Sequence, residues 1–357
     1  MAYHAEPFDP ARHQAALETL WREEFGDPRV RAHVPERMDW LYAQNPLGRA
    51  TTYVTVVTET GETCACATYF PRGLVVHGEP VRGGVLCDFA VNKHNRIAGA
   101  AIAVQRGLAK SARPSGHEIL FGFPNKGSVA VCKRVGYRVI GATSMWVKPL
   151  RSGYKIDVAD TIPEPLKRPA TRVVDAGLAA FDEALALTKL RGFESEELDA
   201  PDARFDALWA RARPTRGIAA ERTRDYLSWR YARFTTSKHR FHALVRRGTG
   251  ELVAYAAYSI EDGRAILQDL FAEDFTRATD ALLVSLAREL RRRGVWSIVL
   301  SFLGPARFGE RLARLGFIER AVDRVMVAYL DPGLDERLRR EFLDAENWFL
   351  LDGELDI

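Results

Sequence analysis

The amino-acid sequence predicts an α/β protein, with a mixed sheet flanked by helices, that consists of a duplicated domain. Strand-like apolar runs alternate with amphipathic helical segments along the 357 residues, as expected where helices cover a sheet. Landmarks of the first half recur in the same order in the second, displaced by 180 to 189 residues. The composition is 47% hydrophobic and includes 18 Phe, 11 Tyr and 7 Trp, which is enough apolar material for two cores of ordinary size.

The repeat can be followed element by element. Trp40 and Trp229 each belong to an aromatic segment that precedes a predicted strand. A later strand carries Asp88 in the first half and Asp269 in the second, and a predicted helix follows each. Another strand, a short helix ending in a Gly-aromatic pair, and a last strand then complete each half. This order at a nearly constant displacement predicts a duplicated domain.

The repeat divides the chain into three segments. Residues 1–150 are the predicted N-terminal domain and residues 201–357 the predicted C-terminal domain. Residues 151–200 contain three prolines and an amphipathic stretch, which predicts a linker and a packing helix. The C-terminal tail carries Trp348 and Phe349, so we expect it to dock on a core.

Composition and patterning exclude several classes of protein. The 51 basic and 47 acidic side chains leave a net charge of +4, too small an excess to indicate a nucleic-acid partner. No apolar run approaches the roughly 18 to 20 residues that a membrane-spanning helix needs, and the first residues do not have the pattern of a secretory signal. The four cysteines lack the spacing of a zinc site. We expect a cytoplasmic protein with reduced thiols, no metal and no membrane partner; the oligomeric state stays open.

A candidate anion-binding segment follows the strand that carries Asp88. This strand ends near Val91, a short polar loop follows, and a helix starts between Arg96 and Gly99. The unpaired N–H groups of a first helical turn, together with the helix dipole, can form a binding site for a phosphate group. Close approach to that backbone is helped by four consecutive small residues, Ala98, Gly99, Ala100 and Ala101.

This segment resembles a family signature. Residues 96–101, Arg-Ile-Ala-Gly-Ala-Ala, match the Arg/Gln-x-x-Gly-x-Gly/Ala motif of the GCN5-related N-acetyltransferase (GNAT) superfamily. Asn125, Ser128 and the pair Gly136-Tyr137 also fit the family's next motif, but Cys132 stands where that motif usually has a tyrosine. The resemblance covers residues 50–150, and the second half shares it only as a pattern of elements.

The resemblance implies two tandem GNAT-like domains, the first of which binds acyl-coenzyme A. The family's pyrophosphate-binding loop corresponds to the segment around Arg96, and the backbone N–H near Val91 would bind the oxyanion. The cofactor-binding residues expected on this basis are Val91, Arg96, Ile97, Ala98, Gly99, Ala100, Ala101 and Asn125.

Transfer of an acyl group to an amine also requires acid and base chemistry. An alkyl amine with a pKa of about 10.4 is mostly protonated at pH 7, so a base is expected. Asp88 and His94 are the candidates, although Asp269 in the second half favours a structural role for Asp88, and a loop histidine is often only solvated. Cys132 is the candidate acid, with a buried inert thiol as the alternative. Some tandem relatives use the chain's terminal carboxylate as the base, which here belongs to Ile357.

The second half departs from the motif. Its corresponding segment, residues 277–282, has Asp280 in place of the glycine and Leu282 in place of a small residue. A carboxylate would repel a pyrophosphate, and a leucine would block close approach to the backbone. We therefore expect one active centre per chain, in the first half.

The function implied by the resemblance is an N-acyltransferase with acetyl-CoA as co-substrate. The acceptor would be a small amine, such as an amino sugar or a secondary-metabolism intermediate. Two alternatives remain open at the level of sequence. A Fem-type aminoacyl transferase also pairs two such domains, but aminoacyl-tRNA has no pyrophosphate that could bind at the predicted phosphate-binding segment. A non-catalytic coenzyme A sensor or scaffold stays open because of Cys132.

Overall fold

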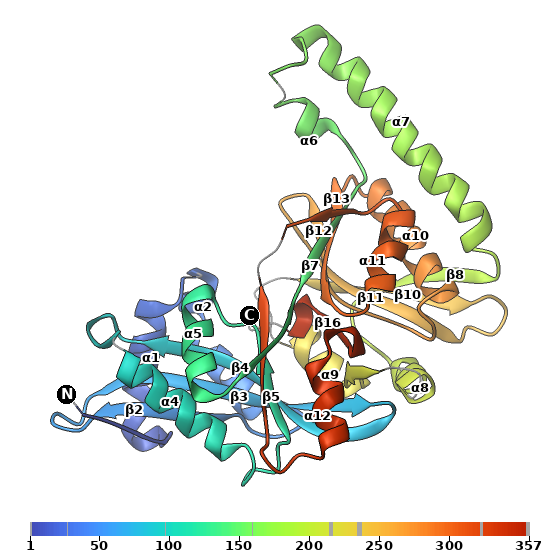
Figure 1. Cartoon of the computed structure of the whole chain (residues 1–357). Helices are drawn as coiled ribbons and strands as arrows, with labels where there is room; N and C mark the ends of the chain where they lie inside the picture. Colours follow the sequence, from blue (N-terminus) through green and yellow to red (C-terminus); the bar gives the residue numbers. More distant parts are fainter. Residues whose placement is uncertain are drawn as a thin grey trace.

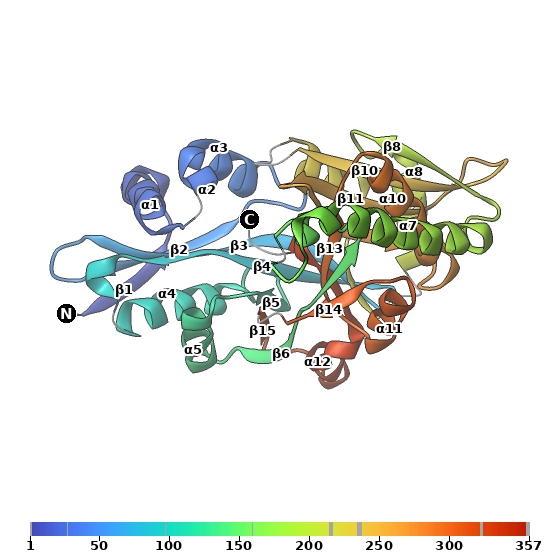
Figure 2. The same ribbon diagram turned by 90° about the horizontal axis from the view of Figure 1, so that it is seen from above.

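The first half forms one end of a continuous sheet. The computed structural model describes residues 2–26, 28–96, 98–158, 160–213, 217–233, 238–321 and 324–354. The strands of the first half are β1 (Tyr3–Pro7), β2 (Thr51–Val57), β3 (Thr63–Val76), β4 (Glu79–Val91), β5 (Ile119–Gly122), β6 (Arg138–Ala142) and β7 (Ser144–Pro149). Its helices are α1 (Pro10–Glu24), α2 (Pro28–Ala32), α3 (Val34–Met38), α4 (Ala98–Ser111) and α5 (Lys126–Val135). Figure 2 shows α1 to α3 on one face of the sheet and α4 and α5 on the other.

The second half repeats this arrangement at the other end of the sheet. Its strands are β8 (Phe193–Leu198), β9 (Ile218–Ala220), β10 (His239–Arg246), β11 (Leu252–Glu261), β12 (Arg264–Ala272), β13 (Ser297–Leu303), β14 (Ile318–Arg320), β15 (Val325–Leu330) and β16 (Trp348–Leu351). Its helices are α8 (Ala203–Ala212), α9 (Arg224–Leu227), α10 (Arg277–Arg292), α11 (Ala306–Arg314) and α12 (Glu336–Leu343). The two halves lie side by side in Figures 1 and 2.

The strands form a mixed sheet, which confirms the predicted fold class. The hydrogen-bonded order is β6-β15-β5-β4-β3-β9-β16-β13-β12-β11-β10-β8. In each half the hairpin strands are antiparallel, and the strand after the crossover helix is parallel to its neighbour: β5 to β4, and β13 to β12. The central strands are almost continuously buried, because helices or loops cover both faces.

The two halves exchange their last strands. The sequence predicts a last strand for each half but not the partner of that strand, and in the structure each last strand pairs with the other half. β7 of the first half pairs with β13 and β14 of the second, and β15 of the second half pairs with β5 and β6 of the first. Only Thr143 separates β6 from β7, so the extended chain continues into the other half instead of turning back.

A local two-fold relation joins the halves at two tryptophans. The indole N–H of Trp40 donates to the carbonyl of Trp229 at 2.8 Å, and the indole N–H of Trp229 donates to the carbonyl of Trp40 at 3.0 Å. The rings stack with their centroids 5.0 Å apart. Both residues are buried, so the repeated aromatic segments pack against each other in the core and do not line an open cleft.

The segment between the halves contains α6 (Gly153–Ile156) and the long helix α7 (Glu164–Lys189). In Figure 1, α7 runs along α10 at one end and extends beyond the sheet at the other. Asp182 anchors it, with its carboxylate 2.7 Å from Lys148 Nζ on β7 and 2.5 Å from Arg291 on α10. Within the described parts of the chain, no helix combines the length and the apolar character needed to cross a membrane.

The tail forms a strand in the middle of the sheet. β16 pairs in parallel with β9 and antiparallel with the end of β13. The following turn, Asp352–Glu354, contacts β12. In this turn, Glu354 forms a bidentate ion pair with Arg72 of the first half, at 2.6 and 2.8 Å. Trp348 and Phe349 are both buried.

Candidate active site

The candidate active site lies where β4 and β5 diverge. Their parallel pairing covers only Gly83 to Val85 on β4 and Ile119 to Phe121 on β5. β4 continues to Val91, while β5 ends at Gly122. A bulge contributes to this divergence: the register between β3 and β4 shifts near Asp88, which has a positive φ of 50°.

The first cavity in this opening has a volume of about 470 Å³. Two helices begin beside it, since α4 contributes Ala101 and α5 contributes Gly127 and Ser128. First-turn N–H groups lack helical partners, so two helix starts and an arginine are features that suit an anion. Its lining residues are Glu24, Phe89, Ala90, Val91, Arg96, Ala101, Asn125, Gly127, Ser128 and Val131.

The orientation of the Val91 backbone follows from its neighbour. The N–H of Asn92 donates to the carbonyl of Cys64 on β3 at 2.8 Å. Because hydrogen-bonding directions alternate along a strand, the N–H of Val91 points away from β3, toward the opening. The backbone therefore presents a donor where the sequence predicts an oxyanion site.

The structure brings together four of the predicted cofactor residues, because Val91, Arg96, Ala101 and Asn125 all line this cavity. Asn125 also caps α5, accepting the N–H of Ser128 at 2.9 Å. Their role in binding a cofactor stays a prediction.

The other predicted cofactor residues lie elsewhere or outside the described parts of the chain. Ala100 is buried, and its carbonyl accepts a hydrogen bond from Thr55. Gly99 is exposed on the side of Tyr3, whose ring would lie 3.1 Å from a Cβ at that position. Ile97 and the side chain of Ala98 lie outside the described residues.

A second cavity of about 360 Å³ adjoins the first. The two share Glu24, Phe89, Asn125 and Ser128. Gln105 of α4 also lines the second cavity, and its buried Oε1 has no hydrogen-bond partner among the described residues. The second cavity can therefore receive an N–H donor next to the first.

Asp88, a predicted base, lines neither cavity. It is 1% exposed, with one oxygen 2.6 Å from Arg37 and the other accepting the Tyr42 hydroxyl at 3.0 Å. Asp269 in the second half also contacts one arginine and one tyrosine, with Arg222 at 3.0 Å and the Tyr255 hydroxyl at 2.6 Å. Because both aspartates are buried and held by an arginine and a tyrosine, we interpret these contacts as structural.

The other two predicted catalytic side chains are His94 and Cys132. His94 is exposed in the short turn Lys93–Asn95 and lines neither cavity. Cys132 lines the second cavity, and burial raises the pKa of its thiol to about 11. The thiol is therefore protonated at neutral pH, as an acid must be before it donates. The catalytic assignments of both residues stay predictions.

Glu24 is a site residue that sequence reasoning missed. It is the last residue of α1, its side chain is 7% exposed, and it lines both cavities. One carboxylate oxygen accepts the N–H of Lys93 at 2.9 Å, and the other pairs with Arg96. Glu24 is more than 60 residues from the motif in sequence, and no local pattern marks it, because only folding brings α1 to the end of β4.

The corresponding opening in the second half is filled. β12 and β13 pair only as far as Leu267 and Leu300, and beyond that point the tail strand β16 joins β13. Asp280 was expected to repel a pyrophosphate, but it is buried and paired with Arg311 at 2.6 Å and Lys189 at 2.8 Å. Its charge is balanced within the protein, and the tail occupies the space between the strands.

The described parts of the chain contain no group of three or more His, Cys, Asp or Glu residues that could hold an ion. All four cysteines are buried and none forms a disulfide.

Comparison with known proteins identifies the fold. No family model matches the sequence, and no curated protein sequence matches it. The structure is similar to a probable N-acyltransferase from Enterococcus faecalis, with a TM-score of 0.64, 12% identity, and coverage of 92% of this chain and 72% of that one. A GCN5-related N-acetyltransferase from Anabaena variabilis gives a TM-score of 0.63 and 12% identity, covering 91% and 72%.

A third solved structure has a comparable length. It is a tandem GNAT protein from the clavulanic acid biosynthesis pathway, with a TM-score of 0.52, 14% identity, and coverage of 93% of this chain and 100% of that one. These similarities confirm the resemblance at the level of the fold, which consists of two tandem GNAT-like domains.

Proposed function

We propose that this protein is an acyl-CoA-dependent N-acyltransferase that uses acetyl-CoA and a small amine. The observation that carries the proposal is the cavity between the diverging strands, where two helix starts, Arg96 and the Val91 N–H converge. The structural neighbours support the same activity, since two of them are described as N-acyl- or N-acetyltransferases. An amino sugar or a secondary-metabolism intermediate is the acceptor class we favour, on the resemblance alone.

The residues of the first cavity fit the coenzyme. Arg96 and the first turns of α4 and α5 would hold its diphosphate. The methyl group of Ala101 and the lack of a side chain at Gly127 leave the backbone accessible. The thioester supplies an activated acyl group. The Val91 N–H would donate to the carbonyl oxygen as negative charge develops there.

We infer that Glu24 is the base for the amine. In the structure Arg96 neutralises its carboxylate. A bound diphosphate would compete for Arg96 and leave Glu24 facing the second cavity, where Gln105 offers an additional acceptor. Glu24 would take one proton from the ammonium group, and the neutral nitrogen would attack the carbonyl carbon. The C–S bond would then break, and the thiolate would leave with a second proton from the same nitrogen.

Substitution of Gly127 tests the cofactor site. A Cβ at Gly127 would meet nothing closer than Asn125 Oδ1 at 3.5 Å, so Gly127→Ala and Gly127→Asp should both fold. The aspartate would place a negative charge in the cavity and weaken acetyl-CoA binding by about tenfold or more, whereas the alanine should change it less than threefold. Calorimetric titration measures both. Equal affinities would place the coenzyme elsewhere.

Glu24→Gln tests the base. We expect kcat/KM for the amine to fall by about 100-fold, because glutamine cannot accept the proton. The affinity for acetyl-CoA should be unchanged or higher, because Arg96 is released. Release of free thiol with a panel of amines measures turnover, and Glu23→Gln is the exposed neighbouring control. Full activity in Glu24→Gln would reject this assignment.

Calorimetry, thiol release and an aminoacyl-tRNA transfer assay together distinguish the alternative functions. Binding of acetyl-CoA without thiol release on any amine would favour a sensor or scaffold. Transfer from aminoacyl-tRNA without acetyl-CoA binding would favour the Fem-type reaction.

A further inference from the structure

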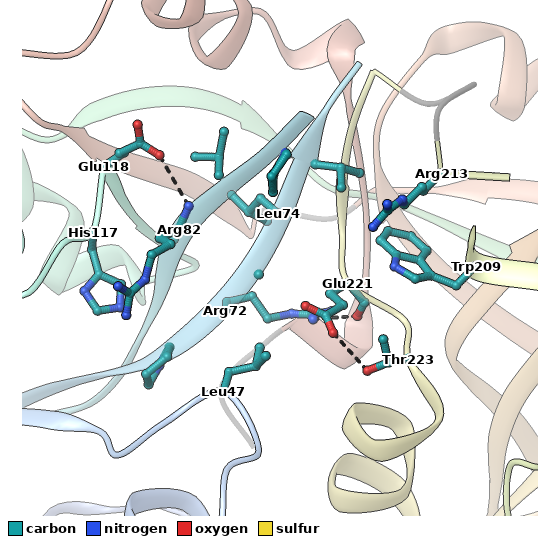
Figure 3. Close-up of a pocket in the computed structure, with 16 residues that line it drawn as sticks. Leu47, Arg72, Leu74, Arg82, His117, Glu118, Trp209, Arg213, Glu221 and Thr223 are labelled. Atoms are coloured by element: carbon teal, nitrogen blue, oxygen red, sulfur yellow. Dashed lines mark hydrogen bonds between the residues drawn. The ribbon is translucent and has the colours of Figure 1, made fainter. Parts of the chain in front are cut away.

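A further cavity of about 470 Å³ lies at the seam between the two halves. Its floor is formed by β3 and β4 near Gly73 and Gly83, and its far wall by Trp209 of α8 and the segment that follows β9. Figure 3 shows side chains of both halves facing each other across it. This volume is in the range of small-molecule sites.

The seam cavity is distant from the candidate active site. Arg82 at its rim and Val91 at the cofactor cavity are nine positions apart on β4. At about 3.3 Å per residue, they are separated by roughly 30 Å. A small ligand in the seam cavity therefore cannot react with an acyl group held at Val91, and the cavity is a separate site.

One buried histidine of this cavity contacts the ring of Tyr69 but has no hydrogen-bond partner in the described parts of the chain. His117 is 5% exposed, and neither of its ring nitrogens forms a hydrogen bond with a described residue. Burial and the neighbouring Arg82 charge lower the pKa of His117 to about 4. The ring is thus neutral at pH 7 and has one N–H donor and one acceptor nitrogen. Because buried polar groups are almost always satisfied, this ring points to a ligand.

Four of the charged side chains that line the cavity, two of each sign, form no ion pairs with described residues. Arg82 and Arg213 line it together with Glu118 and Glu221, and none of the four forms an ion pair with a described residue. Arg72 also lines the cavity, but its guanidinium group forms an ion pair with Glu354. Two cations and two carboxylates match a ligand with both signs of charge better than a simple anion.

The placement of Glu221 is specific. Its Oε1 accepts the Thr223 hydroxyl at 3.0 Å, and its Oε2 lies over Gly73, where any Cβ would overlap it. Gly73 is the cross-strand partner of Arg82. The sheet therefore holds a carboxylate beside an arginine across one strand pair, and glycine provides the space.

We propose that the seam cavity binds a small zwitterionic metabolite of amino-acid or dipeptide size. Its carboxylate faces Arg82 and the ring of His117, and its ammonium group faces Glu221. The site is independent of the acyltransferase proposal, because it requires neither the cofactor cavity nor Glu24.

Calorimetric titration of the full chain with the twenty amino acids and a set of glycyl dipeptides tests this site. We expect at least one compound to bind with a Kd of about 1 mM or lower. Its N-acetylated form, which lacks the ammonium, and its amide, which lacks the carboxylate, should each bind at least tenfold more weakly. Arg82→Gln and Glu221→Gln should each weaken binding at least tenfold, since charge-assisted hydrogen bonds are lost.

Three controls separate this site from the active centre and from general charge effects. Arg314→Gln removes an exposed arginine elsewhere and should leave the affinity unchanged. Glu24→Gln and saturating coenzyme A should also leave it unchanged. Nitrogen NMR should show a shift of the His117 ring signals, identified by their loss in His117→Phe. The proposal fails if no compound binds, if the singly charged forms bind equally well, or if Glu24→Gln abolishes binding.

Discussion

At the scale of single residues, surroundings decide what a carboxylate can do. The sequence predicts that Asp88 lies close to the reacting atoms. In the structure, however, one of its oxygens pairs with Arg37 and the other accepts the Tyr42 hydroxyl. Removing one partner of such a buried pair costs about 3 to 5 kcal/mol, so these side chains are positioned for stability. Glu24 has no motif to mark it, and yet it reaches both cavities.

Asp352 provides a residue-scale prediction on pH. Burial raises its pKa to about 6, against the lowering effect of Arg324 and Ser301. An unfolded aspartate titrates near 3.9, so stability falls as the pH rises from about 4 through about 6, where the folded protein loses the proton. Asp352→Asn should therefore be about 2 kcal/mol more stable than the natural protein at pH 8 and nearly equal to it at pH 4.

Unfolding by guanidinium chloride at pH 4 and pH 8 measures this difference in stability. Asp199→Asn, at an exposed position, is the control. An equal gain at pH 4 and pH 8 would show that the effect of Asp352→Asn does not come from its ionisation.

At the scale of elements, the tail strand β16 makes the two halves unequal. It joins β13 in the second half, whereas the equivalent opening in the first half stays a cavity. Arg72 and Glu354 fix the end of the tail to the first half. Burial alone would raise the pKa of Glu354, but the charge and hydrogen bonds of Arg72 outweigh it and hold this pKa below its ordinary value.

The ion pair of the tail is testable by comparing a single variant with a double variant. Glu354→Gln leaves the buried Arg72 without its counter-charge and should lower the free energy of unfolding by about 3 kcal/mol. Arg72→Met combined with Glu354→Leu should recover part of this loss, because no unpaired charge remains. Chemical denaturation measures each variant, with Glu336→Gln as the exposed control. A loss below 1 kcal/mol would show that the tail is held by apolar packing alone.

At the scale of the whole molecule, the exchanged strands make the halves interdependent. Without β15, the edges of β5 and β6 would lie open in the first half, and open edges promote aggregation. The boundary near residue 150 stays a prediction, and we expect that neither side of it folds separately.

Cleavage of the folded chain tests this interdependence. A protease site inserted between Asp160 and Pro163, in the segment that precedes α7, should allow cutting without separation of the two fragments on a sizing column. Residues 1–150 expressed alone should be insoluble, and co-expression with residues 151–357 should restore a soluble complex. Soluble, monomeric 1–150 would contradict the prediction.

The sequence alone determined the duplicated α/β plan and the position of the candidate cofactor segment. Both depend on local signals, which are the period of apolar residues and the small residues after Arg96. Val91, Arg96, Ala101 and Asn125 do meet at one cavity, because a strand end and two helix starts adjoin in this fold.

Tertiary structure alone decided which strands pair, which carboxylate faces the cavities, and what fills the second opening. A strand pattern specifies that a segment is extended and which face is apolar, but not its partner. The exchange of β7 and β15, the arrival of Glu24 from α1, and the insertion of β16 all join residues far apart in sequence. Such contacts depend on the packing of the complete chain, and no short stretch of sequence contains them.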